Sequence, residues 1–104
     1  MAGVDFKAVR SKISMKQVLA LLGFVPQVES DDQLRGPCPL HGSTSGRSRS
    51  FSASLAKNAY RCFKCGSAGN QLDLWAAAQT MTLYDAALDL CKRLGVEVPW
   101  IREW

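Results

Sequence analysis

Four residues with zinc-binding side chains occur as two closely spaced pairs. Cys38 and His41 form a Cys-x2-His pair, and Cys62 and Cys65 form a Cys-x2-Cys pair after a gap of twenty residues. This spacing lets both side chains of a pair reach one ion from a tight turn, and two such pairs complete a tetrahedron. The spacing therefore predicts one structural Zn²⁺ with four protein ligands and no open position for a catalytic water.

The alternative for these residues is a set of free thiols, or a redox pair at Cys62 and Cys65. A thioredoxin-like pair requires a βαβ context, which the surrounding sequence does not predict. We find no secretory signal and no membrane span, so we expect a cytoplasmic protein without a membrane partner, whose clustered cysteines bind metal. Cys91 lies on the apolar side of a predicted helix, so we leave it out of the metal site.

The positive charge of the chain is concentrated in its centre. The 104 residues carry a formal net charge of +4, and no Asp or Glu occurs from Gln33 through Leu72. Three thiolates around one Zn²⁺ subtract about one charge there. The central segment remains positive, which favours an anionic partner. Its cations are Arg35, Arg47, Arg49, Lys57, Arg61 and Lys64.

The elements that must position the metal ligands form one small α+β domain over residues 1–104. We expect a helical segment at about 5–22, a zinc ribbon at about 24–69 and two helices at about 70–95. The residues that follow, 96–104, form an apolar tail. The ribbon is a small antiparallel sheet in which each of two hairpins delivers one ligand pair.

Caps and periodicity define these elements. Ser14 can cap an amphipathic run in which Val18, Leu21 and Leu22 recur at helical spacing. Alternation from Phe51 to Leu55 predicts a strand with Phe51 on its buried face. The caps of the last two helices are Asn70 for a helix through about Gln79, and Thr82 for a helix that Gly95 ends, with Ala86, Leu90 and Leu94 on its apolar face.

Several short strings match one known family. They are Gly36-Pro37-Cys38-Pro39-Leu40-His41, Ser50-Phe51, Tyr60-Arg61-Cys62-Phe63-Lys64-Cys65-Gly66 and Gly69-Asn70. Over roughly residues 12–96 the sequence resembles the N-terminal Cys-His-Cys-Cys zinc-binding domain of DnaG-type bacterial DNA primases. The segment before Ser50-Phe51 is longer than is usual in that family.

The resemblance implies a module that contacts single-stranded DNA template for primer synthesis in DNA replication, within a primosome. It also implies a primase catalytic domain, or a replicative helicase, as a partner in trans. The chain carries no glutamate plus Asp-x-Asp constellation for two-metal nucleotidyl transfer, so we expect no primer synthesis by the chain alone.

Cations and aromatic residues on the ribbon are the candidates for nucleic-acid contact, because cations follow a phosphate backbone while aromatic rings stack on bases. The first candidates are Arg61 and Lys64 on the ribbon and Arg47 and Arg49 in the adjacent loop. Tyr60 and Phe63 are the candidate stacking groups, and Arg35 and Lys57 complete the set. The plain alternative for the cations is a solvated surface.

A different class of function is a zinc-ribbon module for protein–protein interaction in a replication or mobile-element system. In that case Trp75, Trp100 and Trp104 would dock on a polymerase or another partner, although tryptophans also pack in cores. Salt separates the two hypotheses, because nucleic-acid affinity falls steeply with ionic strength.

Overall fold

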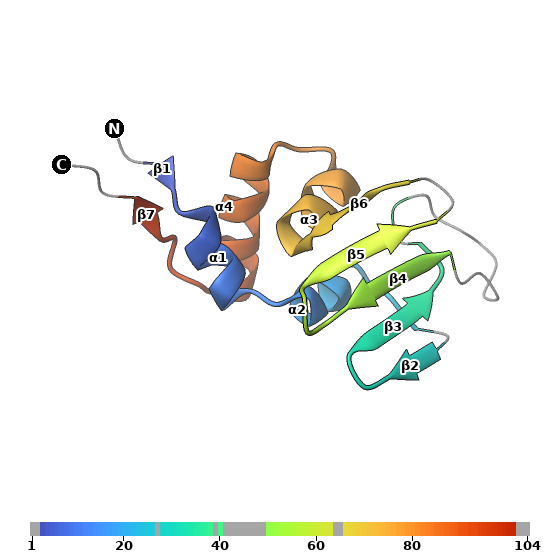
Figure 1. Ribbon diagram of the computed structural model, residues 1–104. Helices are drawn as coiled ribbons and strands as arrows, with labels where there is room; N and C mark the ends of the chain where they lie inside the picture. The colour runs from blue at the N-terminus through green and yellow to red at the C-terminus, as the bar shows by residue number, and fades with distance from the viewer. Residues whose placement is uncertain (1–2, 27, 39, 41–49, 64–65, 102–104) are drawn as a thin grey trace.

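A computed structural model describes residues 3–26, 28–38, 40, 50–63 and 66–101. It has four helices and a five-stranded antiparallel sheet within these ranges, which confirms the α+β class (Figure 1). In chain order the elements are β1 (Gly3–Val4), α1 (Phe6–Lys12), α2 (Met15–Leu21), β2 (Val28–Ser30), β3 (Gln33–Gly36), β4 (Phe51–Ser54), β5 (Ala59–Cys62), β6 (Ala68–Asn70), α3 (Gln71–Gln79), α4 (Leu83–Leu94) and β7 (Trp100–Ile101).

The N-terminal helical segment is two short helices. Ser14 interrupts it, because its side chain accepts a hydrogen bond from the Gln17 amide while Gln17 Oε1 accepts one from the Ser14 amide. This capping box starts α2 with Ser14 outside the helix. The buried face of α2 is formed by Met15, Val18 and Leu19, so the expectation for Leu21 was wrong: that side chain is exposed.

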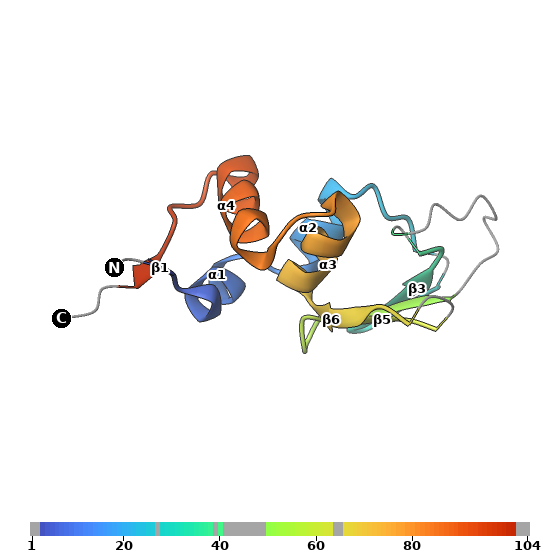
Figure 2. The same cartoon turned by 90° about the horizontal axis from the view of Figure 1, so that it is seen from above.

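The five-stranded sheet has one covered face and one open face. Its strand order is β2-β3-β4-β5-β6, and every neighbouring pair is antiparallel. Figure 2 shows α2 and α3 on one side of the strands, with no helix on the other side. Residues alternate along the strands, so every second side chain enters the core. Those that do so from β3, β4 and β5 are Leu34, Phe51, Ala53, Tyr60 and Cys62.

Phe51 is the centre of the core beneath the sheet. Its ring lies 5.2 Å from that of Phe24 and 5.6 Å from that of Tyr60, measured between centroids. A Cβ at Gly36 would lie 3.1 Å from the Phe24 ring, so the segment after α2 packs tightly against β3 at this glycine. Phe51 is fully buried, as the alternation of β4 predicted.

The two C-terminal helices begin and end at the predicted caps. Asn70 accepts hydrogen bonds from the amides of Leu72 and Asp73 at the start of α3. Thr82 accepts one from the Asp85 amide at the start of α4, and Gly95 ends that helix with a φ of 66°. Because Asn70 is also the last residue of β6, the sheet passes directly into α3.

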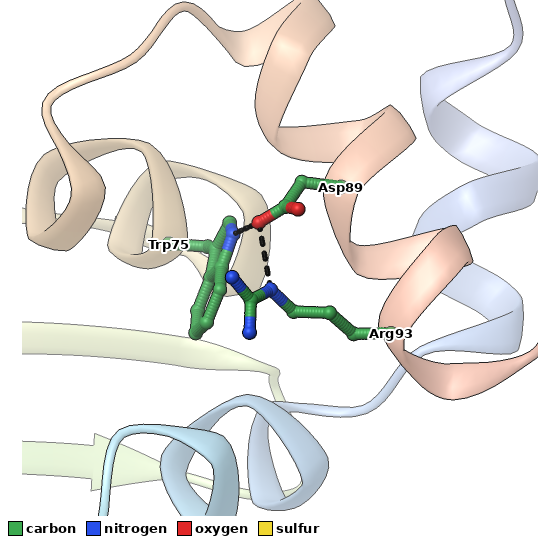
Figure 3. A network of polar contacts seen from close by, with 3 residues as sticks. All are labelled: Trp75, Asp89 and Arg93. Atoms are coloured by element: carbon green, nitrogen blue, oxygen red, sulfur yellow. Dashed lines mark hydrogen bonds and ion pairs between the residues drawn. The ribbon is translucent and has the colours of Figure 1, made fainter.

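A polar cluster joins α3 to α4. Asp89 Oδ2 accepts hydrogen bonds from Trp75 Nε1 at 2.8 Å and from Arg93 Nε at 2.9 Å, and the Arg93 guanidinium lies over the Trp75 ring at 5.2 Å (Figure 3). Partial desolvation raises the pKa of Asp89, but the hydrogen bonds and the charges of Arg93 and Lys92 outweigh it, so this pKa lies below its ordinary value. The cluster fixes the angle between the two helices.

The segments near the two ends of the chain meet away from the large sheet. β1 pairs with β7, with Gly3 opposite Ile101 and Val4 opposite Trp100. Figure 1 shows this pair and the five-stranded sheet at opposite ends of an elongated molecule, whose principal extents are 51, 28 and 22 Å. None of the helices in the described ranges has the length and apolar character that a bilayer crossing requires.

Candidate metal centre and nucleic-acid interface

Cys38 and Cys62 lie at the same end of the five-stranded sheet, which we call the cysteine end. Gly36, Phe51 and Cys62 form one row across β3, β4 and β5, and Cys38 follows Gly36 by two residues. Adjacent strands are about 4.8 Å apart, so this row spans about 10 Å. Both cysteines are buried, with exposed fractions of 2% and 0%. The sheet register therefore brings together one cysteine from each predicted ligand pair.

Backbone amides support both cysteines. The Leu40 amide donates a hydrogen bond of 3.4 Å to Cys38 Sγ. The Gly66 amide donates to the Cys62 carbonyl at 2.9 Å, and the Cys62 amide donates to the Ser67 carbonyl at 2.8 Å. The chain thus turns back to the end of β5 within five residues, a turn that uses a φ of 76° at Gly66, where glycine is favoured.

This donor set suits a zinc ion. A thiol that coordinates metal is deprotonated, and the Leu40 amide donor offsets negative charge on the Cys38 sulfur. Buried thiolates need such compensation from a cation and from N–H donors, and Zn²⁺ provides the cation. His41 and Cys65, the other two predicted ligands, lie outside the described residues. The described half of the site fits the predicted metal.

The open face of the sheet carries two arginines. Arg35, Ser52, Arg61 and Ala68 form one row across β3, β4, β5 and β6. The two arginines are exposed, and the residues around them are small. Because both arginines lie on the open face, a polyanion bound there can contact both of them at once.

Phe63 projects into this positive face just beyond β5. Its side chain is 60% exposed, because position 63 lies two residues after Arg61 and alternation directs both side chains to the open face. The guanidinium carbons of Arg61 and Arg35 lie 5.3 and 5.9 Å from the centre of its ring. Cations at this distance interact favourably with an aromatic ring. The three side chains, which we call the Phe63 platform, combine an exposed ring with two positive charges.

Tyr60 was expected to stack on bases, but it is buried with an exposed fraction of 4%. Successive strand residues point to opposite faces, so Tyr60 enters the core while Arg61 lies on the open face. The Tyr60 ring stacks on Phe51, and its hydroxyl lies 2.7 Å from Ser67 Oγ. Tyr60 therefore positions the turn after Cys62 and does not belong to the open face.

The remaining candidates divide by location. Lys57 is exposed in the turn between β4 and β5. Lys64, Arg47 and Arg49 lie outside the described residues. Cys91 is buried in the face of α4, and burial raises the pKa of its thiol, which keeps it protonated and apolar. The sequence did not identify Ser52 and Ala68 as residues of the open face. The only pattern that could have done so is the alternation of small and buried residues along the strands.

The fold and the cysteine end define a class: a zinc ribbon between two pairs of helices. The family model of the CHC2 zinc finger, the zinc ribbon of DnaG-type primases, matches residues 4–103. The chain belongs to this family, and it is a zinc ribbon of the DNA-primase type. The resemblance noted from the sequence motifs is confirmed.

Similar proteins agree with this assignment. A DNA primase of Synechocystis is 38% identical over 63 residues, which are 61% of this chain and 9% of the relative. A DNA primase of Treponema pallidum is 27% identical over 99 residues, covering 94% of this chain and 16% of the relative. The crystal structure of the zinc-binding and RNA polymerase domains of Aquifex aeolicus primase superposes with a TM-score of 0.72 and 25% identity, over 92% of this chain and 23% of that one. The chain thus spans less than a quarter of each of these proteins.

Proposed function

We propose that this chain is a template-binding zinc module of primase type. It binds single-stranded DNA on the open face of the sheet, supports primer synthesis during replication, and contains no polymerase active site of its own. The observation that carries the proposal is Phe63, which is 60% exposed and has two guanidinium carbons at 5.3 and 5.9 Å from its ring centre. An exposed ring flanked by cations suits a base and its adjoining phosphates.

The role proposed for the metal is structural. One Zn²⁺ bound tetrahedrally by Cys38, His41, Cys62 and Cys65 would lock the ends of β3 and β5 together. Phe63 follows Cys62 directly, so the position of its ring depends on this end of the sheet. Metal analysis of purified protein should give one zinc per chain. Substitution by Co²⁺ should give the visible absorption bands of a tetrahedral site with thiolate ligands.

Single-stranded DNA binding is measured by fluorescence anisotropy with a labelled oligonucleotide between 50 and 200 mM salt. Phe63→Ala should weaken binding by about 1–3 kcal/mol, the usual contribution of one stacked base. Arg61→Gln should reduce the slope of log K against log salt by about 0.7, the loss of one phosphate contact on a single strand. Lys92→Gln, which removes an exposed lysine on α4, is the matched control.

Two results would contradict this function. Binding by Phe63→Ala and Arg61→Gln that equals wild type at every salt concentration would exclude the Phe63 platform as the binding surface. Absence of salt-dependent binding by the zinc-loaded wild-type protein would reject template binding altogether. Each variant is checked by circular dichroism, and both substitutions are at exposed positions, so we expect folding to be unaffected.

The partner proposed in trans is a primase catalytic domain or a replicative helicase. We also propose that residues 1–104 act as one domain. Limited proteolysis tests the second statement, because a single domain should resist cleavage between α2 and β2 and between α3 and α4. Primer synthesis by the purified chain alone would contradict the statement that it has no polymerase site.

Protein–protein interaction is the second candidate function. Trp75 is buried against Asp89 and Arg93, so it offers no surface to a partner. Trp104 lies outside the described residues, while Trp100 and Ile101 are exposed on β7. If this hypothesis is correct, Trp100→Ala should abolish capture of the catalytic domain and leave DNA affinity unchanged.

A further inference from the structure

A second group of cations lies where the connection between α1 and α2 meets the turn between β4 and β5. The residues are Arg10, Lys12, Lys16 and Lys57, all exposed, and we call them the junction cations. We propose that the junction cations bind the phosphate backbone of a single-stranded nucleic acid where it leaves the open face of the sheet. This proposal rests on the template-binding function and extends the binding surface beyond the ribbon.

Hydrogen bonds far apart in sequence hold the junction together. The Met15 amide at the start of α2 donates to Asn58 Oδ1 in the β4–β5 turn at 2.9 Å. Gln71 Nε2 donates to the carbonyls of Arg10 at 3.0 Å and Ile13 at 2.7 Å, so the end of α1 is fixed against the start of α3. The cations of three chain segments are therefore placed in one region by a defined scaffold.

Acidic residues are absent from the N-terminal half of this region. Residues 6–28 contain Lys7, Arg10, Lys12 and Lys16 but no Asp or Glu. Asp31 and Asp32 lie in the turn between β2 and β3, at the same end of the sheet as Lys57, and the Asp32 carbonyl accepts a hydrogen bond from the Leu55 amide. The one ion pair within the described ranges is that of Arg93 with Asp89, so neither aspartate forms an ion pair with a junction cation there. Residues 6–28 are a second acid-free stretch, separate from the one in the ribbon.

Helix stability explains the positions of two junction cations but not those of the other two. Arg10 and Lys12 lie in the last turn of α1, where a positive charge offsets the partial negative charge of a helix C-terminus. Lys16 is the second residue of α2, where a positive charge opposes the helix dipole. Lys57 lies in a turn outside any helix. Lys16 and Lys57 therefore gain no stabilisation from a helix dipole, and contact with a bound polyanion is the role that the proposal gives to both.

The junction continues the proposed interface in space. Lys57 precedes β5, and along that strand Ala59 and Arg61 are separated by about 7 Å at the usual rise per residue. In Figure 2, α1 lies at the level of the strands, beside one end of the sheet and below α4. A single-stranded nucleic acid with one base stacked on Phe63 could run along β5 from Cys62 toward Ala59. Beyond Ala59 it would reach Lys57. An extended polyanion spans these points, whereas a small anion would occupy only one.

Oligonucleotide length tests the proposal. Zinc-loaded Lys16→Gln/Lys57→Gln is compared with wild type on oligonucleotides of about 4 and about 16 nucleotides, the range of site sizes of small single-strand-binding domains. The double variant should bind the longer oligonucleotide about tenfold more weakly, with a salt slope lower by about 1.4 for two lost contacts. Its affinity for the shorter one should equal that of wild type.

The matched control is Lys92→Gln/Arg93→Gln, which removes the same charge from two exposed cations of α4, outside the junction. Equal weakening by both double variants, or wild-type affinity of Lys16→Gln/Lys57→Gln for the longer oligonucleotide, would overturn the inference and leave the Phe63 platform standing. If wild type binds neither oligonucleotide, the template-binding function itself is wrong and the inference is rejected with it.

Discussion

Removing the Asp89 carboxylate tests how the two C-terminal helices are held together. Trp75 is only 2% exposed, so Asp89→Ala leaves the buried indole N–H without its acceptor. An unsatisfied buried donor costs about 1–3 kcal/mol. Arg93 is about half exposed, so its i,i+4 pair with Asp89 adds only about 0.3–0.5 kcal/mol. We expect Asp89→Ala to lower the free energy of unfolding by about 2–3 kcal/mol.

Arg93→Ala should be milder. It removes the exposed ion pair and a cation–π contact of about 0.5–1 kcal/mol, but it leaves the Trp75 hydrogen bond in place. Urea unfolding of zinc-loaded protein, followed by circular dichroism, gives both values. Glu97→Ala removes an exposed acid and serves as the control. If Arg93→Ala lowered the free energy of unfolding as much as Asp89→Ala does, the hydrogen bond from Trp75 to Asp89 would not be the largest contribution of this cluster.

The depressed pKa of Asp89 predicts how this contribution depends on pH. The carboxylate is bound more tightly in the folded state, so its pKa is lower there than in the unfolded chain. The stabilisation is therefore complete above the unfolded pKa and is lost as the pH falls through the folded value. The difference between wild type and Asp89→Asn should be constant near neutrality and shrink only in acid. Both proteins carry the same metal ligands, so the pH dependence of zinc binding cancels.

Three further predictions concern the metal and the turns. A chelator should unfold the ribbon and abolish DNA binding together, because folding and metal binding are linked in small sites. Circular dichroism and DNA affinity are measured before and after chelation. An apo protein that keeps both its spectrum and its affinity would show that the zinc is dispensable. Cys38→Ser should abolish stoichiometric zinc binding by metal analysis, whereas Cys91→Ser should retain it. Gly69→Ala should destabilise by at least about 2 kcal/mol in urea, because its φ is 154° and the added Cβ would lie against Asp73, so a neutral effect would contradict the geometry.

Local signals in the sequence predicted much of this fold. Ser14, Asn70, Thr82 and Gly95 act as the caps and the stop that their types suggested, because capping depends on residues a few positions apart. The buried Phe51 followed from alternation in the same way. These features require no knowledge of distant partners.

The features that escaped prediction depend on tertiary contacts. Gln71 is fully buried because its side chain reaches the carbonyls of Arg10 and Ile13, about sixty positions earlier, and no local pattern reveals this. On α2, Val18 is buried and Leu22 packs against the core as predicted, whereas Leu21 is exposed, because the core that α2 meets is formed by Met15, Val18 and Leu19. Tyr60 was proposed as a stacking group, although alternation along β5 directs it to the core when Arg61 lies on the open face.

At the candidate site, the sequence identified ligands and cations but could not rank them. The spacing of the cysteines and the histidine predicted a zinc site, and the register places Cys38 and Cys62 at one end of the sheet. Of the candidate cations that the structure describes, Arg35 and Arg61 have their guanidinium carbons 5.9 and 5.3 Å from the Phe63 ring centre, and Lys57 is not among these contacts. Which cations lie near Phe63 depends on how the strands pair, and the sequence alone does not give this pairing.

The pairing of β1 with β7 has a mechanical consequence. Gly3 lies opposite Ile101 at the outer end of a ladder only two residues long, with Val4 and Trp100 as the inner rung. Tension applied to the two ends of the chain would load the outer rung first and peel the strands apart one pair at a time, which requires far less force than shearing a sheet. The helices and the five-stranded sheet would bear no load until this ladder had opened. A force that pulls the two ends apart therefore acts first on the β1–β7 pair, which opens easily. The surface around Phe63, at the opposite end of the molecule, would keep its structure while that pair opens.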